Sequence, residues 1–382
     1  MMKTVLILLT LLQLSLFAAN TKSSDEIDYV TLATLLMKDG YYSRAVETLN
    51  EADTTQEAFD FAMYYTLQGL IYAKQKLYTV SNEAFDKAIA SGQDDRSIYL
   101  YMAQNSFKLH AYQETLDALQ RARALVTQKP QLLSLKAECY WKLKQHNKAL
   151  QTLEDLEHTF KTYYALYKQR FNYLIELELY QSAFDDAQVY LLKEKANVKS
   201  YLSFVGALRK SGAMRKATLL AERGNLLFDD SAEMTVMLAH LYLDQEMINS
   251  AANLFDEASI EDSKYTKEAA EMLRRAHEFT LSLYKNAQLT DTKEKYKQRI
   301  AIYLEFSAYE RVVATAGALK RSGLIEDENI RYALAYAYYM NGDFEKSEQE
   351  LAMLRRSDLF EKATVLRKNI QKCQNDMWEC AL

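Results

Sequence analysis

Residues that form turns and cross-links are scarce in this sequence. The 382 residues include only nine glycines, one proline and three cysteines. A β-sandwich or β-barrel needs glycine- and proline-rich turns at short intervals, so the sequence argues against both. The formal net charge is −5, with both signs interspersed, which offers no broad positive surface for nucleic acid. Because 49% of the residues are hydrophobic, the chain can build a large core, and the shortage of turns predicts a long helical array.

The N-terminal segment has the features of a secretory signal peptide. A lysine precedes an apolar run from Val5 to Leu12, which resumes after Gln13 and ends in small residues at Ala18 and Ala19. That run is too short, and too interrupted, for a transmembrane helix. The sequence therefore predicts residues 1–19 as a signal peptide cleaved after Ala18 or Ala19, and a protein exported to the periplasm. An uncleaved anchor is the alternative, and it would be the only contact with a membrane.

The three cysteines fall into two groups. Cys139 lies in a helical apolar pattern, which predicts a small packed side chain. Cys373 and Cys380 are seven residues apart, so in an unbroken helix their Cα atoms would be about 10.5 Å apart, beyond the roughly 7 Å that a disulfide spans. A bridge requires the last helix to end near Asn375 and Asp376. An oxidising compartment permits the bond, and the sequence leaves it open.

A single repeating pattern dominates the chain. The residues three, nine, twelve and sixteen positions after each repeat's reference residue follow the same mainly apolar or small pattern from unit to unit. The six reference residues in unbroken, evenly spaced register are Gly69, Ala103, Ala137, Phe171, Val205 and Ala239. This spacing predicts two amphipathic helices joined by a short turn. One such pair cannot bury its own apolar faces, so the pairs must stack.

These residues resemble the tetratricopeptide repeat (TPR), a 34-residue helix–turn–helix with a W-x₂-L-G-x₂-Y…A-x₃-F pattern. The residues that match it best are Tyr65, Gly69, Tyr72, Phe255, Ala258, Gly342 and Phe344. The resemblance implies an all-α, right-handed α-solenoid of about nine TPR-like repeats with a C-terminal capping helix.

The register of the repeats predicts how the chain is divided. It breaks between Ala258 and Lys297, where one long helix is predicted over Tyr265–Leu283. This segment is interpreted as a decayed repeat with a connector, and a hinge is the alternative. The predicted parts after the signal peptide are an N-terminal array of about seven repeats (25–259), an irregular helical connector (260–296), two further repeats (297–356) and the capping helix (357–382).

The sequence contains no motif for catalysis or for a cofactor. Its five histidines are scattered, no H-E-x-x-H pairs two of them, and no cysteine pair has zinc spacing. The glycine-rich motifs of nucleotide-binding loops, G-x-x-x-x-G-K and G-x-G-x-x-G, are also absent. The sequence therefore predicts a protein that is not an enzyme and that has no metal, no small-molecule cofactor and no nucleic-acid partner.

The resemblance implies that partners bind on the concave surface, which first-helix residues line when they do not face the core. The predicted partner-binding residues are Phe107, Glu138, Trp141, Lys168, Asn172, Tyr332, Tyr336 and Tyr339. The first five form the main predicted groove, in repeats three to five, and the three tyrosines form a second apolar patch. Exposed aromatic rings need a partner to cover them. For Trp141, packing against the adjacent repeat is the alternative.

Together these features predict an exported, non-catalytic scaffold that binds a protein or peptide in a cell-envelope assembly. Two alternatives remain open. One is an accessory of envelope polysaccharide export or binding, in which Trp141 and the tyrosines stack on sugar rings. The other is a periplasmic chaperone for outer-membrane proteins.

Overall fold

The computed structural model describes residues 27–194, 196–375 and Cys380. These residues are all-helical and contain no strand, which confirms the predicted fold class. The predicted signal peptide, residues 1–19, lies outside the described residues. Among the residues described, no helix combines the length and the apolar character needed to cross a bilayer.

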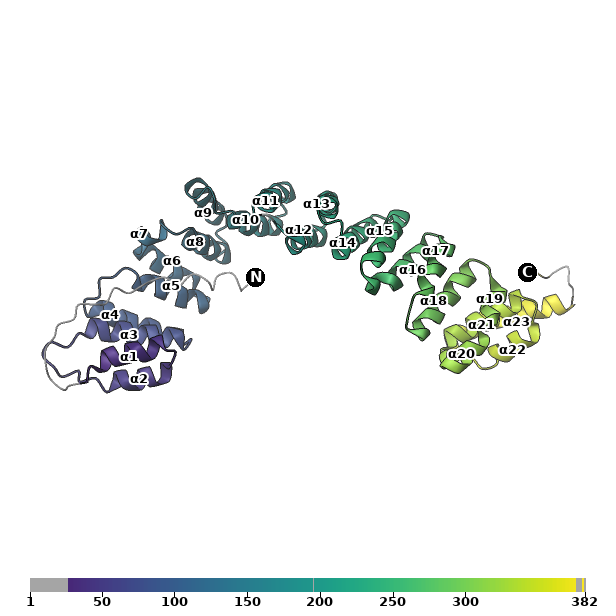
Figure 1. Ribbon diagram of the computed structural model, residues 1–382, viewed down its shortest axis with the longest axis horizontal. Coiled ribbons are helices and arrows are strands. Elements are labelled where there is room, and N and C mark those ends of the chain that lie inside the picture. The colour runs from purple at the N-terminus through teal and green to yellow at the C-terminus, as the bar shows by residue number, and fades with distance from the viewer. Residues whose placement is uncertain (1–26, 195, 376–379, 381–382) are drawn as a thin grey trace. The chain divides into compact units, whose positions relative to one another are not determined.

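The helices belong to two compact units, which consist of the described residues up to Lys161 and of those from Thr162 onward. Within each unit, successive helices form pairs, and the second helix of one pair contacts the first helix of the next (Figure 1). The pairs of the first unit are α1 (Tyr29–Lys38) with α2 (Tyr42–Asn50), α3 (Phe61–Lys74) with α4 (Tyr78–Ala90), α5 (Ile98–Lys108) with α6 (Tyr112–Arg121) and the short α7 (Arg123–Val126), and α8 (Pro130–Lys142) with α9 (His146–Thr159).

The second unit continues the same succession of pairs and ends in an unpaired helix. Its elements are α10 (Ala165–Glu176) with α11 (Tyr180–Lys193), α12 (Val198–Lys210) with α13 (Met214–Leu227), α14 (Ala232–Asp244) with α15 (Ile248–Glu261), the 3₁₀ turn η2 (Ser263–Tyr265), α16 (Thr266–Arg275) with α17 (Phe279–Ala287), α18 (Thr292–Glu305) with α19 (Tyr309–Ala314) and α20 (Ala316–Ser322), the 3₁₀ turn η3 (Leu324–Glu326), α21 (Glu328–Met340) with α22 (Phe344–Leu351), and α23 (Ser357–Asn375).

The turn inside each pair has one backbone conformation throughout. The first helix ends in a left-handed residue with φ between 56° and 85°, and in the second pair the next N–H, that of Leu77, donates to the carbonyl of Tyr72 at 2.9 Å. The left-handed residues are Gly40, Lys76, His110, Lys144, Glu178, Gly212, Glu246, His277, Ser307 and Gly342. The described residues therefore contain ten helix pairs, one more than the nine predicted.

The additional pair lies in the predicted connector, residues 260–296, so the prediction of an irregular segment is wrong there. Helices α16 and α17 pack against each other, and His277 between them has φ 61°. The single helix predicted over Tyr265–Leu283 is therefore wrong as well. An apolar cluster that includes Phe255 and Leu273 runs from α14 through α15 to α16, so the first part of the predicted connector shares the core of the preceding pair.

Small residues let the two helices of a pair approach closely. A Cβ placed on Gly69 would lie 2.5 Å from Cε1 of Phe85, whose side chain is fully buried. The hydroxyl of Ser81 on α4 donates to the carbonyl of Gly69 on α3 at 2.6 Å. Equivalent bonds join Ser282 to Ala270 at 2.6 Å and Ser347 to Ala335 at 2.8 Å. These contacts explain the small residues of the repeating pattern.

We expect Lys76→Gly to raise the free energy of unfolding by about 0.5–1 kcal/mol, because glycine adopts a left-handed conformation without steric cost. Lys74→Gly is the matched control, two residues earlier in the helical part of α3, and should lower the same free energy by about 0.5–1 kcal/mol. Urea denaturation of both variants measures the difference. Effects of the same sign would contradict the assignment of a left-handed turn at Lys76.

Deleting one complete repeat should leave the remaining helix pairs intact. Removal of residues 179–212 takes out one full repeat in phase and joins equivalent positions of consecutive pairs. Removal of residues 179–195 takes out only α11 and leaves α10 without its partner helix. Far-UV circular dichroism should show normal helicity per residue for the first deletion and a large loss for the second. Equal losses would contradict the repeat architecture.

Candidate functional site

Two of the predicted partner-binding residues lie half-buried in the first unit. Phe107, on α5, packs edge-to-face against Tyr112 in its own turn, with ring centroids 5.8 Å apart. Glu138, on α8, forms an ion pair with Lys142 one helical turn later, at 3.4 Å, and its side chain is 27% exposed. Both side chains have surface available to a partner, so the prediction for them stands as a prediction.

Trp141 does not have the exposure that the sequence predicted. Its side chain is only 3% exposed, and its ring centroid lies 4.2 Å from that of His146 at the start of α9. The indole therefore fills the space across the turn of its own repeat. The prediction of Trp141 as an exposed anchor of a groove is wrong, and the ring is part of the core.

Lys168 and Asn172 lie on α10, in the second unit. Lys168 is exposed, and its Nζ lies 5.9 Å from the ring centroid of Tyr190. The Asn172 amide donates to the carbonyl of Lys168 at 2.9 Å, so part of its hydrogen-bonding capacity is used within the helix. The prediction of Lys168 and Asn172 as partner-binding residues stays a prediction.

The second predicted patch, formed by Tyr332, Tyr336 and Tyr339 on α21, is partly covered by the chain itself. Tyr339 is 3% exposed, and the other two rings are half-buried against the same apolar cluster. The residues of α23 in that cluster are Leu359, Ala363, Leu366, Ile370 and Cys373. The prediction of an exposed side chain is therefore wrong for Tyr339, which the C-terminal helix covers; for the half-buried Tyr332 and Tyr336, partner binding stays a prediction.

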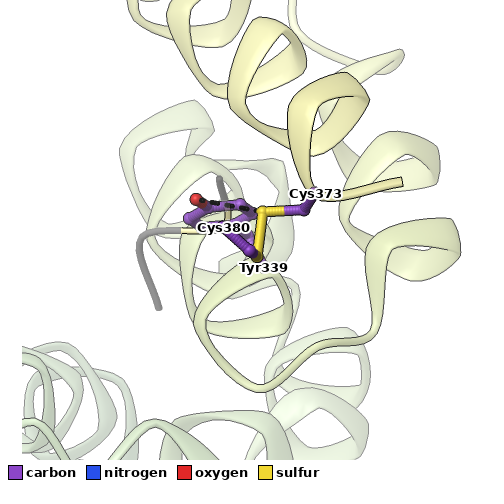
Figure 2. The surroundings of a disulfide bond; sticks show 3 residues. All are labelled: Tyr339, Cys373 and Cys380. Carbon is purple, nitrogen blue, oxygen red and sulfur yellow. Dashed lines mark hydrogen bonds between the residues drawn. A yellow bond between two sulfur atoms is a disulfide. The ribbon is translucent and has the colours of Figure 1, made fainter. Parts of the chain in front are cut away.

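A disulfide holds the end of the chain at this cluster. Cys373 and Cys380 are bonded, with their Cα atoms 4.4 Å apart, and α23 ends at Asn375 between them. Figure 2 shows the bridge beside the ring of Tyr339, whose hydroxyl lies 3.9 Å from the Cys373 sulfur. The bridge that the sequence left open is thus present, and it closes the C-terminal end of the second unit.

An open cleft of about 560 Å³ lies elsewhere in the second unit, at the first helices of two consecutive pairs. We name it the α12–α14 cleft. Its lining residues are Gly206, Arg209 and Lys210 of α12, Met214 at the start of α13, and Met237 and Asp244 of α14. It thus combines apolar side chains, charged groups of both signs and one position without a side chain.

The charges in the α12–α14 cleft are arranged around one bidentate ion pair. Arg209 donates from Nε and Nη2 to the two carboxylate oxygens of Asp244, at 2.5 and 3.0 Å. The hydrogen bonds from Arg209 lower the pKa of Asp244, and the same bonds raise the pKa of Arg209. On the neighbouring turn of α14, burial and then the charge of Arg209 lower the pKa of His240. The negative charge of Asp244 is therefore compensated by Arg209 within the cleft.

Gly206 has no structural reason to be glycine. It lies within α12, and a Cβ placed on it would meet no other atom within 4 Å. A glycine inside a helix costs about 1 kcal/mol relative to alanine. The helical glycines Gly69 and Gly224 differ, because a Cβ there would lie 2.5 and 2.9 Å from an aromatic side chain. The open space at Gly206 enlarges the α12–α14 cleft at the expense of helix stability.

None of the residues that line the α12–α14 cleft was among the predicted partner-binding residues. A signal was available, because Gly206 is the only glycine at its repeat position. The residues in the equivalent positions are Leu70, Gln104, Glu138, Asn172 and His240. A glycine at a lining position within a predicted helix, followed by Arg209 and Lys210, indicates an opening with positive charge.

The described residues offer binding surfaces but no evident reaction chemistry. Across the part of the chain that the structure describes, no group of three or more His, Cys, Asp or Glu side chains could hold a metal ion. Cys139 is fully buried, as predicted, and burial followed by the charge of Glu138 raises the pKa of its thiol to about 12. A thiol so buried and so weakly acidic is a packing group.

The class of protein follows from these observations: an α-solenoid of stacked helix–turn–helix repeats. Residues 74–156 match the family model described as anaphase-promoting complex, cyclosome, subunit 3, which is of the TPR type. This match, together with the evenly spaced repeat register and the helix pairs, identifies the repeats as TPR-like. Such a fold is generally a non-catalytic scaffold that binds proteins or peptides.

Similar solved structures include two bacterial TPR proteins and YrrB. The C-terminal part of a TPR repeat-containing protein from Cytophaga hutchinsonii is 14% identical, covers 62% of this chain and 93% of its own, and has a TM-score of 0.44. A TPR protein from Parabacteroides merdae is 14% identical, with 64% and 97% covered and a TM-score of 0.44. YrrB, described as a TPR protein with an unusual peptide-binding site, is 18% identical, with 47% and 91% covered and a TM-score of 0.40. A search of curated proteins gives no match.

Proposed function

We propose that this chain is an exported, non-catalytic scaffold that binds a partner protein in the cell envelope, and that the α12–α14 cleft is a docking point. The observation that carries this proposal is the unfilled space above Gly206. Glycine destabilises helix α12, and no packing contact within the chain requires it at this position. The open space is therefore available to a group of a binding partner. The methionines and the paired and unpaired charges around it are typical of a protein-binding surface.

Two features support export. The predicted signal peptide directs the chain out of the cytoplasm, and the disulfide between Cys373 and Cys380 suits an oxidising compartment. Alkylation of the denatured protein, trapped directly from cells with acid, tests this. If the protein is exported, only Cys139 should react before reduction and all three cysteines after it. Three reactive thiols before reduction would contradict export.

Isolation of the tagged protein from envelope extracts tests the scaffold role. A single protein in stoichiometric amount, retained after washing at moderate salt, supports a scaffold. A bound glycan would overturn the proposal in favour of an accessory of polysaccharide export or binding. Many unrelated, unfolded outer-membrane proteins would overturn it in favour of a chaperone. The variant Gly206→Leu serves as the control, because it should lose a partner that docks in the α12–α14 cleft.

A further inference from the structure

We infer that the α12–α14 cleft receives an acidic residue of the partner protein, flanked by aliphatic residues. This inference rests on the proposed function and names the chemistry of the segment that docks. The carboxylate would meet Lys210 and the outer side of the Arg209 guanidinium, and the aliphatic neighbours would lie against Met214 and Met237.

The balance of charge in the α12–α14 cleft points to an anion. Of the three charged lining residues, Arg209 and Asp244 neutralise each other through two hydrogen bonds. Lys210 is exposed, and among the described residues no ion pair or hydrogen bond engages its ammonium group. Arg215 and Lys216 follow at the start of α13, within the same turn region. The cleft therefore has a net positive charge.

The positive charge is local, which limits how many acidic residues can dock. The turn of the preceding pair contains Glu178, and the turn of the following pair contains Glu246. A long polyanion laid across these three turns would meet repulsion on both sides of α12. One acidic residue, or two, in an otherwise uncharged segment fits the alternation of charge.

The apolar part of the cleft accepts aliphatic side chains of varied shape. Met214 and Met237 are half-buried and flexible, and methionine adapts to irregular partners. Gly206 leaves the approach between them open, so that a partner's backbone can come close to α12. The α12–α14 cleft therefore offers an extended segment with a central acidic residue both a positive charge for the carboxylate and an apolar surface for its neighbours.

Selection from a displayed library of random nine-residue peptides tests the inference on the protein produced from the full-length sequence. Peptides are retained on the wild type after those that also bind Gly206→Leu have been removed. The Gly206→Leu variant should fold with an unchanged or higher melting temperature, because a Cβ at this position meets no other atom within 4 Å and leucine is a better helix former than glycine. We expect the recovered peptides to be enriched in Asp or Glu beside Leu, Ile or Met.

Charge reversal then separates the inference from the proposed function. For the strongest peptide recovered, Lys210→Glu should weaken binding at least tenfold in fluorescence anisotropy, and selection on Lys210→Glu should recover basic peptides. Lys74→Glu, at the equivalent position of the second pair, should bind as the wild type does. Recovered peptides without acidic enrichment would overturn the inference and leave the docking point standing. If no peptide distinguishes the wild type from Gly206→Leu, both are wrong.

Discussion

Trp141→Ala is expected to lower the free energy of unfolding of the α8–α9 pair by about 3–5 kcal/mol. The indole is 3% exposed and packs edge-to-face on His146, so its truncation leaves a cavity between α8 and the start of α9. Helix pairs in a repeat array can open separately, so native-state hydrogen exchange of the amides of α8 and α9 measures the loss where it occurs.

Leu109→Ala is the control for this measurement. Leu109 lies in the turn between α5 and α6 of the same unit and is 44% exposed, so its truncation should change stability by no more than about 0.5 kcal/mol. Unchanged protection in Trp141→Ala, together with loss of the partner, would contradict the buried role and make Trp141 a contact residue after all.

Glu350→Leu is expected to destabilise the α21–α22 pair by about 3–5 kcal/mol. Arg331 and Glu350 form an ion pair at 2.9 Å, and their side chains are 11% and 10% exposed. Without Glu350, the buried guanidinium keeps one ion-pair partner among the described residues, Glu326, whose carboxylate lies 3.7 Å away and whose side chain is 81% exposed. An uncompensated buried charge costs more than an ion pair contributes, so the loss should exceed that from removing an exposed pair.

The double variant Arg331→Met/Glu350→Leu should recover most of that loss, since buried apolar residues can replace a buried ion pair. Lys346→Met removes an exposed pair with Asp343, at 2.6 Å, and should cost much less than Glu350→Leu. Hydrogen exchange of α21 and α22 in the four proteins tests this order. If the double variant is as unstable as Glu350→Leu, the loss does not come from the uncompensated charge of Arg331, and this explanation is wrong.

The repeated core could be predicted from the sequence because close packing of the helices requires small residues at regularly spaced positions. The backbones of a pair approach each other only at small residues, and Ala103, Ala137 and Ala239 recur at the same repeat position with at most 1% exposure. The eighth pair escaped this search because its helices are shorter. Helix α16 has 10 residues where α14 has 13, so Ala270 follows Ala239 too early for the period.

The candidate binding residues were harder to predict, because their exposure depends on individual side-chain contacts that the 34-residue repeat pattern does not specify. The repeat position of Trp141 predicted that its side chain lies beside the groove. The side chain instead points toward His146, and this direction depends on its rotamer, which the repeat pattern does not determine. Tyr339 was predicted to be exposed because its cover comes from Cys373 and its helix, later in the chain and outside the repeats. Gly206 was missed because the search for repeats finds side chains that recur in the packed core. A single glycine at a lining position leaves no such recurring pattern.

Site-specific photo-crosslinking in cells tests most directly that the α12–α14 cleft binds a protein partner. A photoreactive amino acid at Ser203, which is exposed one helical turn before Gly206, faces the same side of α12 as the cleft. The same group at Leu219 of α13, 49% exposed, samples the second helix of the pair as a control. The account predicts one discrete crosslinked protein from position 203 and none from position 219. Equal crosslinking from both positions, or none from position 203, would contradict it.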